Sequence, residues 1–413
     1  MIDHSYHYEI TELDRIRCGP LGPHLDSFAH WLAAQGYSRL AATRKIRLVA
    51  HWSRWLHQRH IGLKQLNEHR IGDFLKRHRR QTRWHKHTRY TLAQLLQQLR
   101  RAKLIPDRPS PDTERSIDPL MRDYERFLAQ ERGLSQASLN SYLPIARHFL
   151  SEVLGAGALR LDKLGAADIS RFVLRATSTL SPKRVQLTTS VLRSFLGFLY
   201  QRGQLTAPLA GAVPTVATWR WSDLPRFLEP EQVHQLLESC DRGSQRGQRD
   251  YAILLLLARL GLRAGEVAGL NLEDLDWHSG EVLIRGKGSR EDRLPLPPDV
   301  GRALATYLQK ARPPCSCRRV FLRTQAPRGG FSGSASISKI VGRALLRSHL
   351  DPAHKGAHLL RHSLATRMLR GGASLTQIGQ VLRHQHAQTA EIYAKVDFAA
   401  LRAVAQPWPG GAR

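Results

Sequence analysis

The second half of the chain contains basic side chains whose chemistry suits a phosphate ester. Arg263 follows an expected helix end at Gly261, and Arg361 lies three residues after His358 on one face of an expected helix. Guanidinium groups bind phosphate oxygens through paired hydrogen bonds, and imidazoles exchange protons near neutral pH. Taken alone, each residue has a commoner interpretation, since arginines often cap helix ends and polar helix faces often only contact water.

Further candidates extend this group of cations. Lys287 lies at an expected hairpin tip, where it is able to protonate a departing oxygen. Tyr393 follows His384 by nine residues, and its phenol needs neighbouring cations to react as a phenolate, because the ordinary pKa of tyrosine is near 10. We interpret Glu266 as a carboxylate that orients Arg263 or a histidine. A solvated turn lysine and a half-buried tyrosine are the ordinary alternatives.

The complete set, in this order, resembles the catalytic block of the tyrosine recombinases, also called phage integrases. The similarity covers about residues 227–400 and rests on short strings: Gly-Leu-Arg-Ala-Gly-Glu at 261–266, Gly-Lys-Gly at 286–288, His-Leu-Leu-Arg-His at 358–362, Leu-Arg-His at 382–384 and Ile-Tyr at 392–393. The resemblance implies Arg263, Lys287, His358, Arg361, His384 and the nucleophile Tyr393 as catalytic residues, with Glu266 in support. It further implies a tetramer, of one or two kinds of chain, that acts on two double-stranded DNA sites.

The spacing of His384 and Tyr393 places a demand on the fold. Nine residues at 100° each make 900°, so one continuous helix would put the two side chains on opposite sides. We therefore expect a helix break in the polar stretch 383–387. His386 in this stretch competes with His384 for the same role.

Other elements of the C-terminal third follow from local patterns. Alternating apolar residues predict a β-hairpin of strands 281–285 and 293–297, with a turn at 286–289. Helices are expected at 229–237, 248–260, 298–311, 335–349, 357–371 and 374–383, and the second of these is apolar enough to be buried. A short amphipathic helix at 398–404 is expected either to pack on its own domain or to dock on a neighbouring protomer.

The remaining residues divide at proline-rich stretches into two similar helical segments. Leu66, Ile71 and Phe74 have counterparts 98 positions later, and each segment has the apolar spacing of about four helices. We therefore expect a mainly α protein in which tandem helical DNA-clamping domains precede a mostly helical catalytic domain with a small antiparallel sheet. The expected boundaries are a tail 1–20, a helical domain 21–106, a linker 107–118, a helical domain 119–206, a linker 207–226, a catalytic domain 227–406 and a tail 407–413. The resemblance identifies 119–206 with the family's DNA-clamping domain, and 21–106 as a second copy.

The charge of the chain points to a polyanionic partner. Lys and Arg number 63 against 34 Asp and Glu, a formal net charge of +29, and residues 51–100 alone carry 12 basic side chains against 2 acidic ones. We assign DNA binding to the densest part of this segment, namely Lys76, Arg77, Arg79, Arg80, Arg83, Lys86 and Arg89. A solvated face and a protein-docking surface are the alternatives.

Other classes of protein are disfavoured. Four scattered cysteines do not make a disulfide framework, residues 1–14 do not resemble a signal peptide, and the longest apolar stretch, 252–258, is too short to cross a membrane. We expect a cytoplasmic protein without metal or nucleotide cofactor, since no acidic cluster or phosphate-binding glycine pattern is present. The expected activity is site-specific recombination of DNA through a 3′-phosphotyrosyl intermediate, for integration, excision or transposition. A type IB topoisomerase-like enzyme and a catalytically silent DNA-binding relative are the alternatives.

Overall fold

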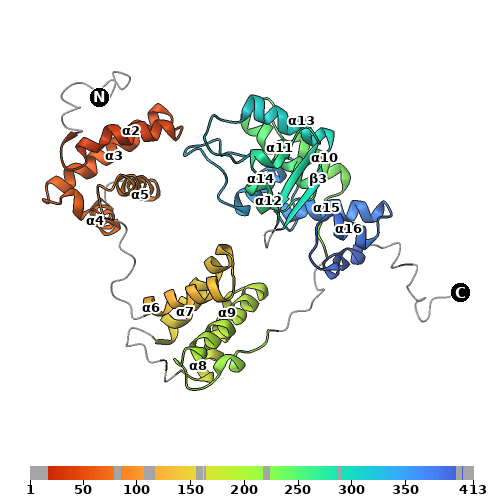
Figure 1. Ribbon diagram of the computed structural model, residues 1–413, viewed down its shortest axis with the longest axis horizontal. Coiled ribbons are helices and arrows are strands. Elements are labelled where there is room, and N and C mark those ends of the chain that lie inside the picture. Colours follow the sequence, from red (N-terminus) through yellow and green to blue (C-terminus); the bar gives the residue numbers. More distant parts are fainter. Residues whose placement is uncertain are drawn as a thin grey trace. The chain divides into compact units, whose positions relative to one another are not determined.

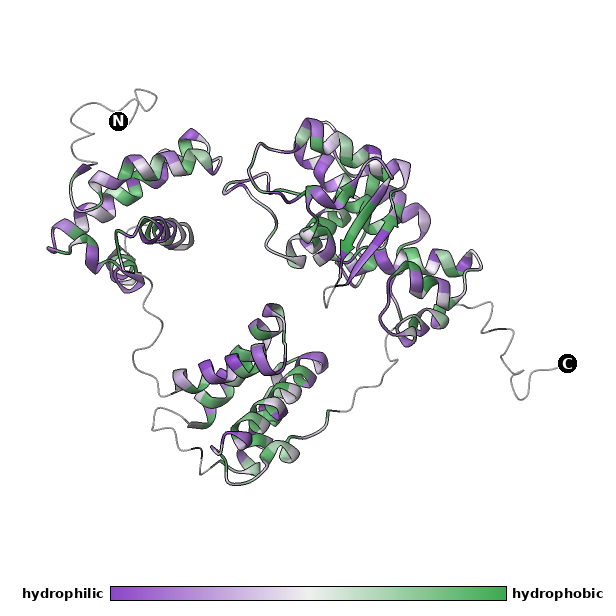
Figure 2. Cartoon of the chain, viewed as in Figure 1, coloured by the Kyte–Doolittle hydropathy of each residue, from purple (hydrophilic) through white to green (hydrophobic). Residues whose placement is uncertain are grey.

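Figure 1 shows the computed structural model of the chain, which is built mainly from helices. The structure describes residues 17–78, 85–106, 117–154, 161, 164–216, 224–286, 290–396 and 402. Figure 2 shows both hydrophobic and hydrophilic residues on many of the helices, which suits one face of such a helix to a core. None of the described helices is long and apolar enough to cross a membrane.

Residues 17–106 form the first helical domain. Its α-helices are α2 (Leu25–Ala34), α3 (Arg39–His57), α4 (Glu68–His78) and α5 (His85–Arg101). Ser38 begins α3 as a cap, because its hydroxyl accepts a hydrogen bond from the backbone N–H of Ala41. Trp52 and Phe74 are among the large side chains buried in the core between these helices.

Residues 117–216 form the second helical domain, which has its own core. Its helices are α6 (Ile117–Arg126), continued by a π-helical turn at Phe127–Glu131, and then α7 (Gln136–Leu154), α8 (Ala166–Thr179) and α9 (Pro182–Gln201). Tyr124, Phe149 and Phe195 are buried in its centre.

The two helical domains place matching aromatic contacts at matching positions. The rings of His51 and Phe74 lie 5.6 Å apart in the first domain, and those of His148 and Phe172 lie 5.5 Å apart in the second. The paired residues are offset by 148 − 51 = 97 and 172 − 74 = 98 positions. This agreement supports the interpretation of the two domains as copies of one unit.

Residues 224–396 form the C-terminal block. Its helices are α10 (Pro230–Glu238), α11 (Gln245–Arg259), α12 (Ala264–Gly269), α13 (Pro298–Thr306), α14 (Ser334–Arg347), α15 (Ala357–Arg370) and α16 (Leu375–Val381). Helix α11 is buried along Ala252–Ala258, as its apolar sequence predicts, and it forms the centre of the core. A π-helical turn at Tyr307–Ala311 continues α13, and 3₁₀ turns at Ala387–Thr389 and Glu391–Val396 follow α16.

A three-stranded antiparallel sheet, in the order β1 (Leu275–Asp276), β2 (Glu281–Arg285) and β3 (Glu291–Pro295), covers one side of this core. Val282 and Ile284 point inward and are buried. The expected hairpin is present, but β3 begins two residues earlier than predicted. A cross-strand ion pair between Arg285 Nε and Glu291 Oε1, at 3.2 Å, favours this register. The mainly α fold with a small antiparallel sheet is confirmed.

Candidate functional site

Arg361 lies at the centre of the site and connects three segments of the C-terminal block. Its side chain is on α15 and only 4% exposed, and it donates to the backbone carbonyls of Gly261 and Leu382. Gly261 lies two residues after the end of α11 and has φ +58°, a conformation that favours glycine. The guanidinium therefore holds the end of α11 next to the turn that follows α16.

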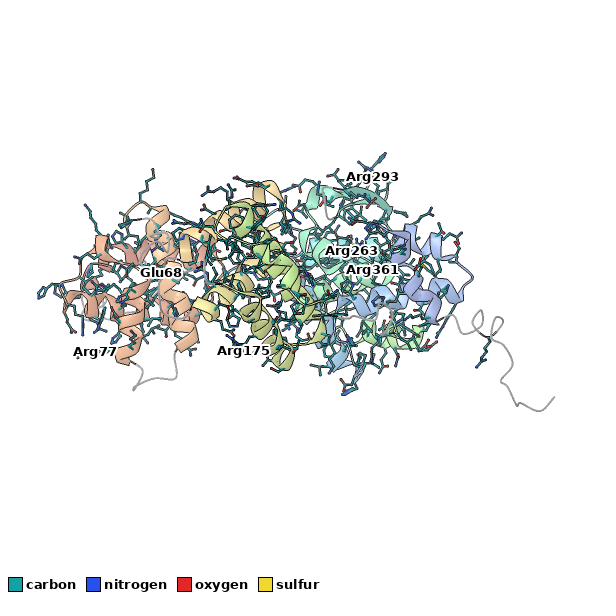
Figure 3. The ribbon with its side chains drawn as sticks, turned by 90° about the horizontal axis from the view of Figure 1, so that it is seen from below. Glu68, Arg77, Arg175, Arg263, Arg293 and Arg361 are labelled. Carbon is teal, nitrogen blue, oxygen red and sulfur yellow. The ribbon has the colours of Figure 1, made fainter. Side chains whose placement is uncertain are left out.

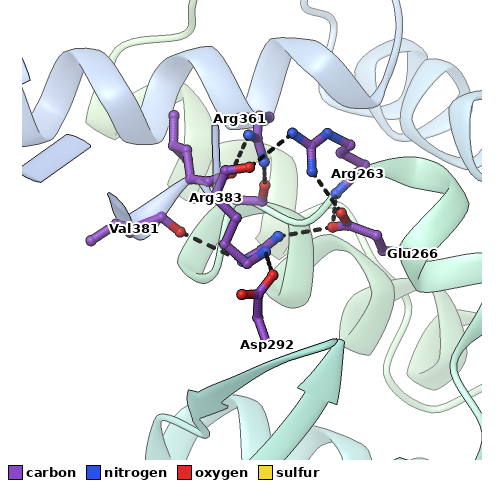
Figure 4. A network of polar contacts seen from close by, with 8 residues as sticks. Arg263, Glu266, Asp292, Arg361, Val381 and Arg383 are labelled. Carbon is purple, nitrogen blue, oxygen red and sulfur yellow. Dashed lines mark hydrogen bonds and ion pairs between the residues drawn. The ribbon is translucent and has the colours of Figure 1, made fainter. Parts of the chain in front are cut away.

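Arg263 reaches the same turn from the start of α12. Its Nη1 donates to Glu266 Oε1 at 2.8 Å, and its Nη2 donates to the carbonyl of Arg383 at 3.2 Å (Figure 4). Its side chain is 38% exposed, against 5% for Glu266. Arg263 thus keeps part of its guanidinium accessible, while Arg361, labelled beside it in Figure 3, is buried.

Glu266 bonds to a second arginine as well. Its Oε2 accepts a hydrogen bond from Arg383 Nη2 at 2.8 Å and another from the backbone N–H of Arg263 at 2.8 Å. Arg383 is itself buried, with φ +53°, and its Nε lies 3.9 Å from Asp292 on β3. The carboxylate of Glu266 therefore orients Arg263, as the sequence predicts, and also fixes the turn that carries Arg383.

Tyr393 is buried on the 3₁₀ turn at Glu391–Val396, near histidines of α15 and of the turn after α16. Its hydroxyl oxygen lies 3.0 Å from Nδ1 of His362, and its ring is nearly parallel to the ring of His384 at 6.4 Å. The ring of His358 lies 6.2 Å from that of His362 on the same face of α15. The predicted helix break is present, because α16 ends at Val381 and the chain turns before His384. The two side chains consequently meet.

Burial and neighbouring cations shift the pKa values of these groups. Burial raises the pKa of Tyr393 to about 12, although the charge of Arg361 acts in the opposite direction. Burial, reinforced by neighbouring imidazole and guanidinium groups, lowers the pKa of His362 and of His384 to about 4. Partial burial of its ring, together with Arg361 and Arg263, also lowers the pKa of His358, much of which is exposed. These histidines are therefore neutral at pH 7.

Burial and the charge of Arg263 lower the pKa of Arg361 to about 10, which leaves this guanidinium protonated at neutral pH. Nδ1 of His384 is buried and has no hydrogen-bond partner within the described part of the chain. The site thus combines two cationic side chains with neutral imidazoles around one phenol.

An open cleft of about 830 Å³ lies against this group. Its lining includes Arg263, Arg290, Asp292, Arg383, His384 and His386. His386 is exposed on the wall of the cleft, whereas His384 is half-buried and stacks on Tyr393. This position favours His384 over its competitor.

Some predicted residues cannot be placed. Lys287 lies outside the described residues, as do Arg79, Arg80, Arg83 and most of the expected helix at 398–404. Lys76 and Arg77 are exposed at the end of α4, and Arg89 is exposed on α5. Lys86 is on α5 as well, but its side chain is not described.

Sequence reasoning assigned no role to two residues of the site. His362 follows Arg361 directly, and its position four residues after His358 on one helix face is a signal that was available. Arg383 gave no comparable signal, because a left-handed conformation of an arginine is not visible in a sequence. Within the described ranges, His, Cys, Asp and Glu side chains form no group of three or more that could hold a metal ion.

Comparison of the sequence with known proteins identifies the family of the chain. Residues 226–400 match the phage integrase family, and residues 121–203 match the phage integrase N-terminal SAM-like domain. Over 396 residues the chain is 43% identical to the putative integrase/recombinase y4rA of Sinorhizobium fredii (strain NBRC 101917 / NGR234), and the alignment covers 96% of both chains.

A second relative and one solved structure extend the comparison. The chain is 31% identical over 308 residues to the tyrosine recombinase XerD of Mycobacterium tuberculosis (strain CDC 1551 / Oshkosh), covering 70% of this chain and 96% of that one. The fold resembles a crystal structure of the XerH site-specific recombinase bound to its palindromic difH substrate, with a TM-score of 0.56 and 20% identity over 70% of this chain and 84% of that one. The chain is a member of the phage integrase family, the tyrosine site-specific recombinases.

Proposed function

We propose that the chain cuts and rejoins double-stranded DNA through a covalent bond between Tyr393 and a 3′-phosphate. The Tyr393 oxygen attacks the phosphorus, the bond from phosphorus to the 5′-oxygen breaks, and the 5′-hydroxyl leaves with a proton. Attack by the 5′-hydroxyl of a partner strand reverses the step and releases tyrosine. The observation that carries the proposal is the convergence of Arg263 and Arg361 on the turn that brings His384 against Tyr393.

The two arginines have distinct proposed roles. The transition state places growing negative charge on the two non-bridging phosphate oxygens, and preorganised guanidiniums stabilise such charge without reorganisation. Arg263 is half-exposed at the cleft and contacts one oxygen directly in this proposal. Arg361 already donates to two carbonyls, so it contributes its charge and its remaining N–H groups.

Four side chains are assigned to proton transfer or to hydrogen bonding with the phosphate. A neutral His362 with its proton on Nε2 accepts a hydrogen bond from the hydroxyl of Tyr393 at Nδ1, 3.0 Å away, and takes the proton as the bond from oxygen to phosphorus forms, because the phenolic oxygen becomes acidic at that point. His358 and His384 donate hydrogen bonds to the phosphate oxygens, and His384 lines the cleft. Lys287, from the turn between β2 and β3, protonates the leaving 5′-oxygen, as the resemblance implies.

We further propose a tetramer that exchanges strands between two DNA sites, for integration, excision or transposition of a DNA element. The family supports this assembly, and the relative from Sinorhizobium fredii carries the name of a putative integrase/recombinase. A DNA substrate is consistent with the cytoplasmic location expected from the sequence.

The experiment that tests the proposal traps the covalent intermediate. DNA flanking the gene supplies candidate sites. A nick placed a few nucleotides beyond the scissile phosphate lets the short fragment that carries the released 5′-hydroxyl diffuse away, so the ester accumulates. We expect a protein–DNA adduct with the wild-type chain. We expect none with Tyr393→Phe, which loses one oxygen and should bind DNA as before. An adduct formed by the Phe variant would contradict Tyr393 as the nucleophile.

A further inference from the structure

Helix α3 of the first helical domain carries an unusual concentration of positive charge. Within Arg39–His57 the sequence has five Lys or Arg residues and no Asp or Glu. Arg44, Arg47, His51 and Arg54 are all exposed, and at 100° per residue they lie within an arc of about 80° on one face of the helix. We call these four residues the α3 stripe. Arg44 and Arg54 span about 15 Å at a rise of 1.5 Å per residue.

The second helical domain serves as an internal control for this charge. Its helix α7 corresponds to α3 at an offset of 97, which pairs His51 with His148 in equivalent contacts with Phe74 and Phe172. At the positions of the three stripe arginines α7 has Ser141, Pro144 and Ser151. The whole of α7 carries one arginine and one glutamate, a net charge of zero.

The stripe therefore is not required by the fold that the two domains share. Like charges three or four positions apart on a helix destabilise it by a few tenths of a kcal/mol per pair. Within the described residues, no acidic side chain forms an ion pair with Arg44 or Arg54. A partner outside the domain that supplies negative charge along about 15 Å would complement these two exposed cations.

We propose that the α3 stripe binds the phosphate backbone of double-stranded DNA, so that the first helical domain is a second DNA-contacting module beside the catalytic one. The proposal rests on the proposed function, because a chain that recombines DNA already holds this polyanion. A row of arginines on a rigid helix suits a regular series of phosphates, and phosphate contacts position a protein without reading sequence.

The test compares two charge-matched double variants of the full chain. Arg44→Gln with Arg54→Gln removes two charges from the stripe. Lys64→Gln with Arg101→Gln removes two exposed charges of the same domain that lie off it. Glutamine is nearly as good a helix former as arginine, so both variants should fold, which thermal melting checks. Affinity for a long duplex of arbitrary sequence is measured over a range of salt concentrations.

We expect the stripe variant to bind more weakly and to have a slope of log K against log salt that is shallower by about 2, since each phosphate contact contributes about 0.9. The control variant should keep the wild-type slope. Equal slopes for the stripe variant and wild type would overturn the proposal and favour a protein-docking face. Equal flattening in both variants would overturn it in favour of a diffuse charge effect.

A separate readout distinguishes failure of this inference from failure of the proposed function. The stripe variant should still form the Tyr393 adduct on a nicked core site at low salt, because its substitutions lie outside the C-terminal block. If the wild-type chain forms no adduct on any site, the proposed function fails. If it forms the adduct and the salt slopes are unchanged, only the assignment of the α3 stripe fails.

Discussion

The arginines of the C-terminal block and those of the α3 stripe have the same chemistry in opposite surroundings. Arg361 is 4% exposed and bonded to two carbonyls, and Arg263 is tied to Glu266. Arg44 and Arg54 are exposed on one helix face. A buried, bonded cation contributes in one fixed geometry, so its loss should be severe. A solvated cation contributes through screened attraction, so its loss should be small, additive and dependent on salt.

The largest effect is expected at the half-exposed arginine of the site. Arg263→Ala removes a preorganised donor from the developing phosphate charge, which typically slows a reaction by about 10²–10³-fold. The single-turnover rate of adduct formation measures the effect. Arg367→Ala, an exposed position on α15, is the control and should react at the wild-type rate. If Arg263→Ala slowed adduct formation by less than about tenfold, Arg263 would not be a main source of stabilisation for the phosphate charge.

Arg361→Ala should differ from Arg263→Ala in stability. Its removal leaves the buried carbonyls of Gly261 and Leu382 without their donor, at a cost of about 1–3 kcal/mol each. We expect denaturant titration to show a clear loss of unfolding free energy for Arg361→Ala and a much smaller one for Arg263→Ala. Equal losses would contradict the contrast between a buried structural cation and an accessible one.

A smaller loss of stability is expected when the carboxylate of Glu266, which lies between Arg263 and Arg383, is neutralised. Glu266→Gln keeps the size of the side chain but removes the carboxylate 2.8 Å from the buried Arg383, which leaves Asp292 at 3.9 Å from its Nε. Breaking a buried pair from one side typically costs about 3–5 kcal/mol, and the retained amide oxygen should reduce that cost here. A double-mutant cycle with Arg383→Gln isolates the pair, because the double variant should recover part of the loss. An additive cycle would show that the two residues do not stabilise each other.

The smallest effect is expected from pH. His362 and His384 have pKa values near 4 in the folded state and near 6.5 when unfolded, so the unfolded chain binds more protons between these values. The contribution of these two histidines to the free energy of unfolding should therefore be fully present above about pH 6.5 and be lost as the pH drops toward 4. The melting temperature over this range checks the sign.

Two histidine variants, one buried and one exposed, test whether the buried imidazoles cause the effect of pH on stability. His362→Gln should flatten the acid side of the stability profile, and the exposed His354→Gln should leave it unchanged. If the flattening is the same in both, general charge repulsion is responsible, and the buried imidazoles are not.

The sequence predicted the positions of most helices and six of the residues that meet in the site, because apolar periodicity and short motifs depend on local chemistry. The prediction for Lys287 falls outside the described residues. The sequence did not predict which imidazole contacts the nucleophile. That contact depends on the turn after α16, where Arg383 adopts φ +53° and Glu266 holds it across 117 positions of sequence. Nor did it predict the start of β3, which the pairing of Arg285 with Glu291 determines. Long-range pairs of this kind leave no periodic trace.

Gly261 limits how far this protein can vary during evolution. A Cβ atom at this position would lie 2.7 Å from Leu382 Cδ2 and 3.0 Å from Leu364 Cδ2, in addition to the strain of a positive φ. Its carbonyl also accepts a hydrogen bond from Arg361. Substitution there would force the side chains of Leu382 and Leu364 to move and would strain the backbone whose carbonyl accepts a hydrogen bond from Arg361. A changed charge on the surface of a helical domain disturbs only its surroundings, whereas a changed Gly261 disturbs the contacts that position Arg361.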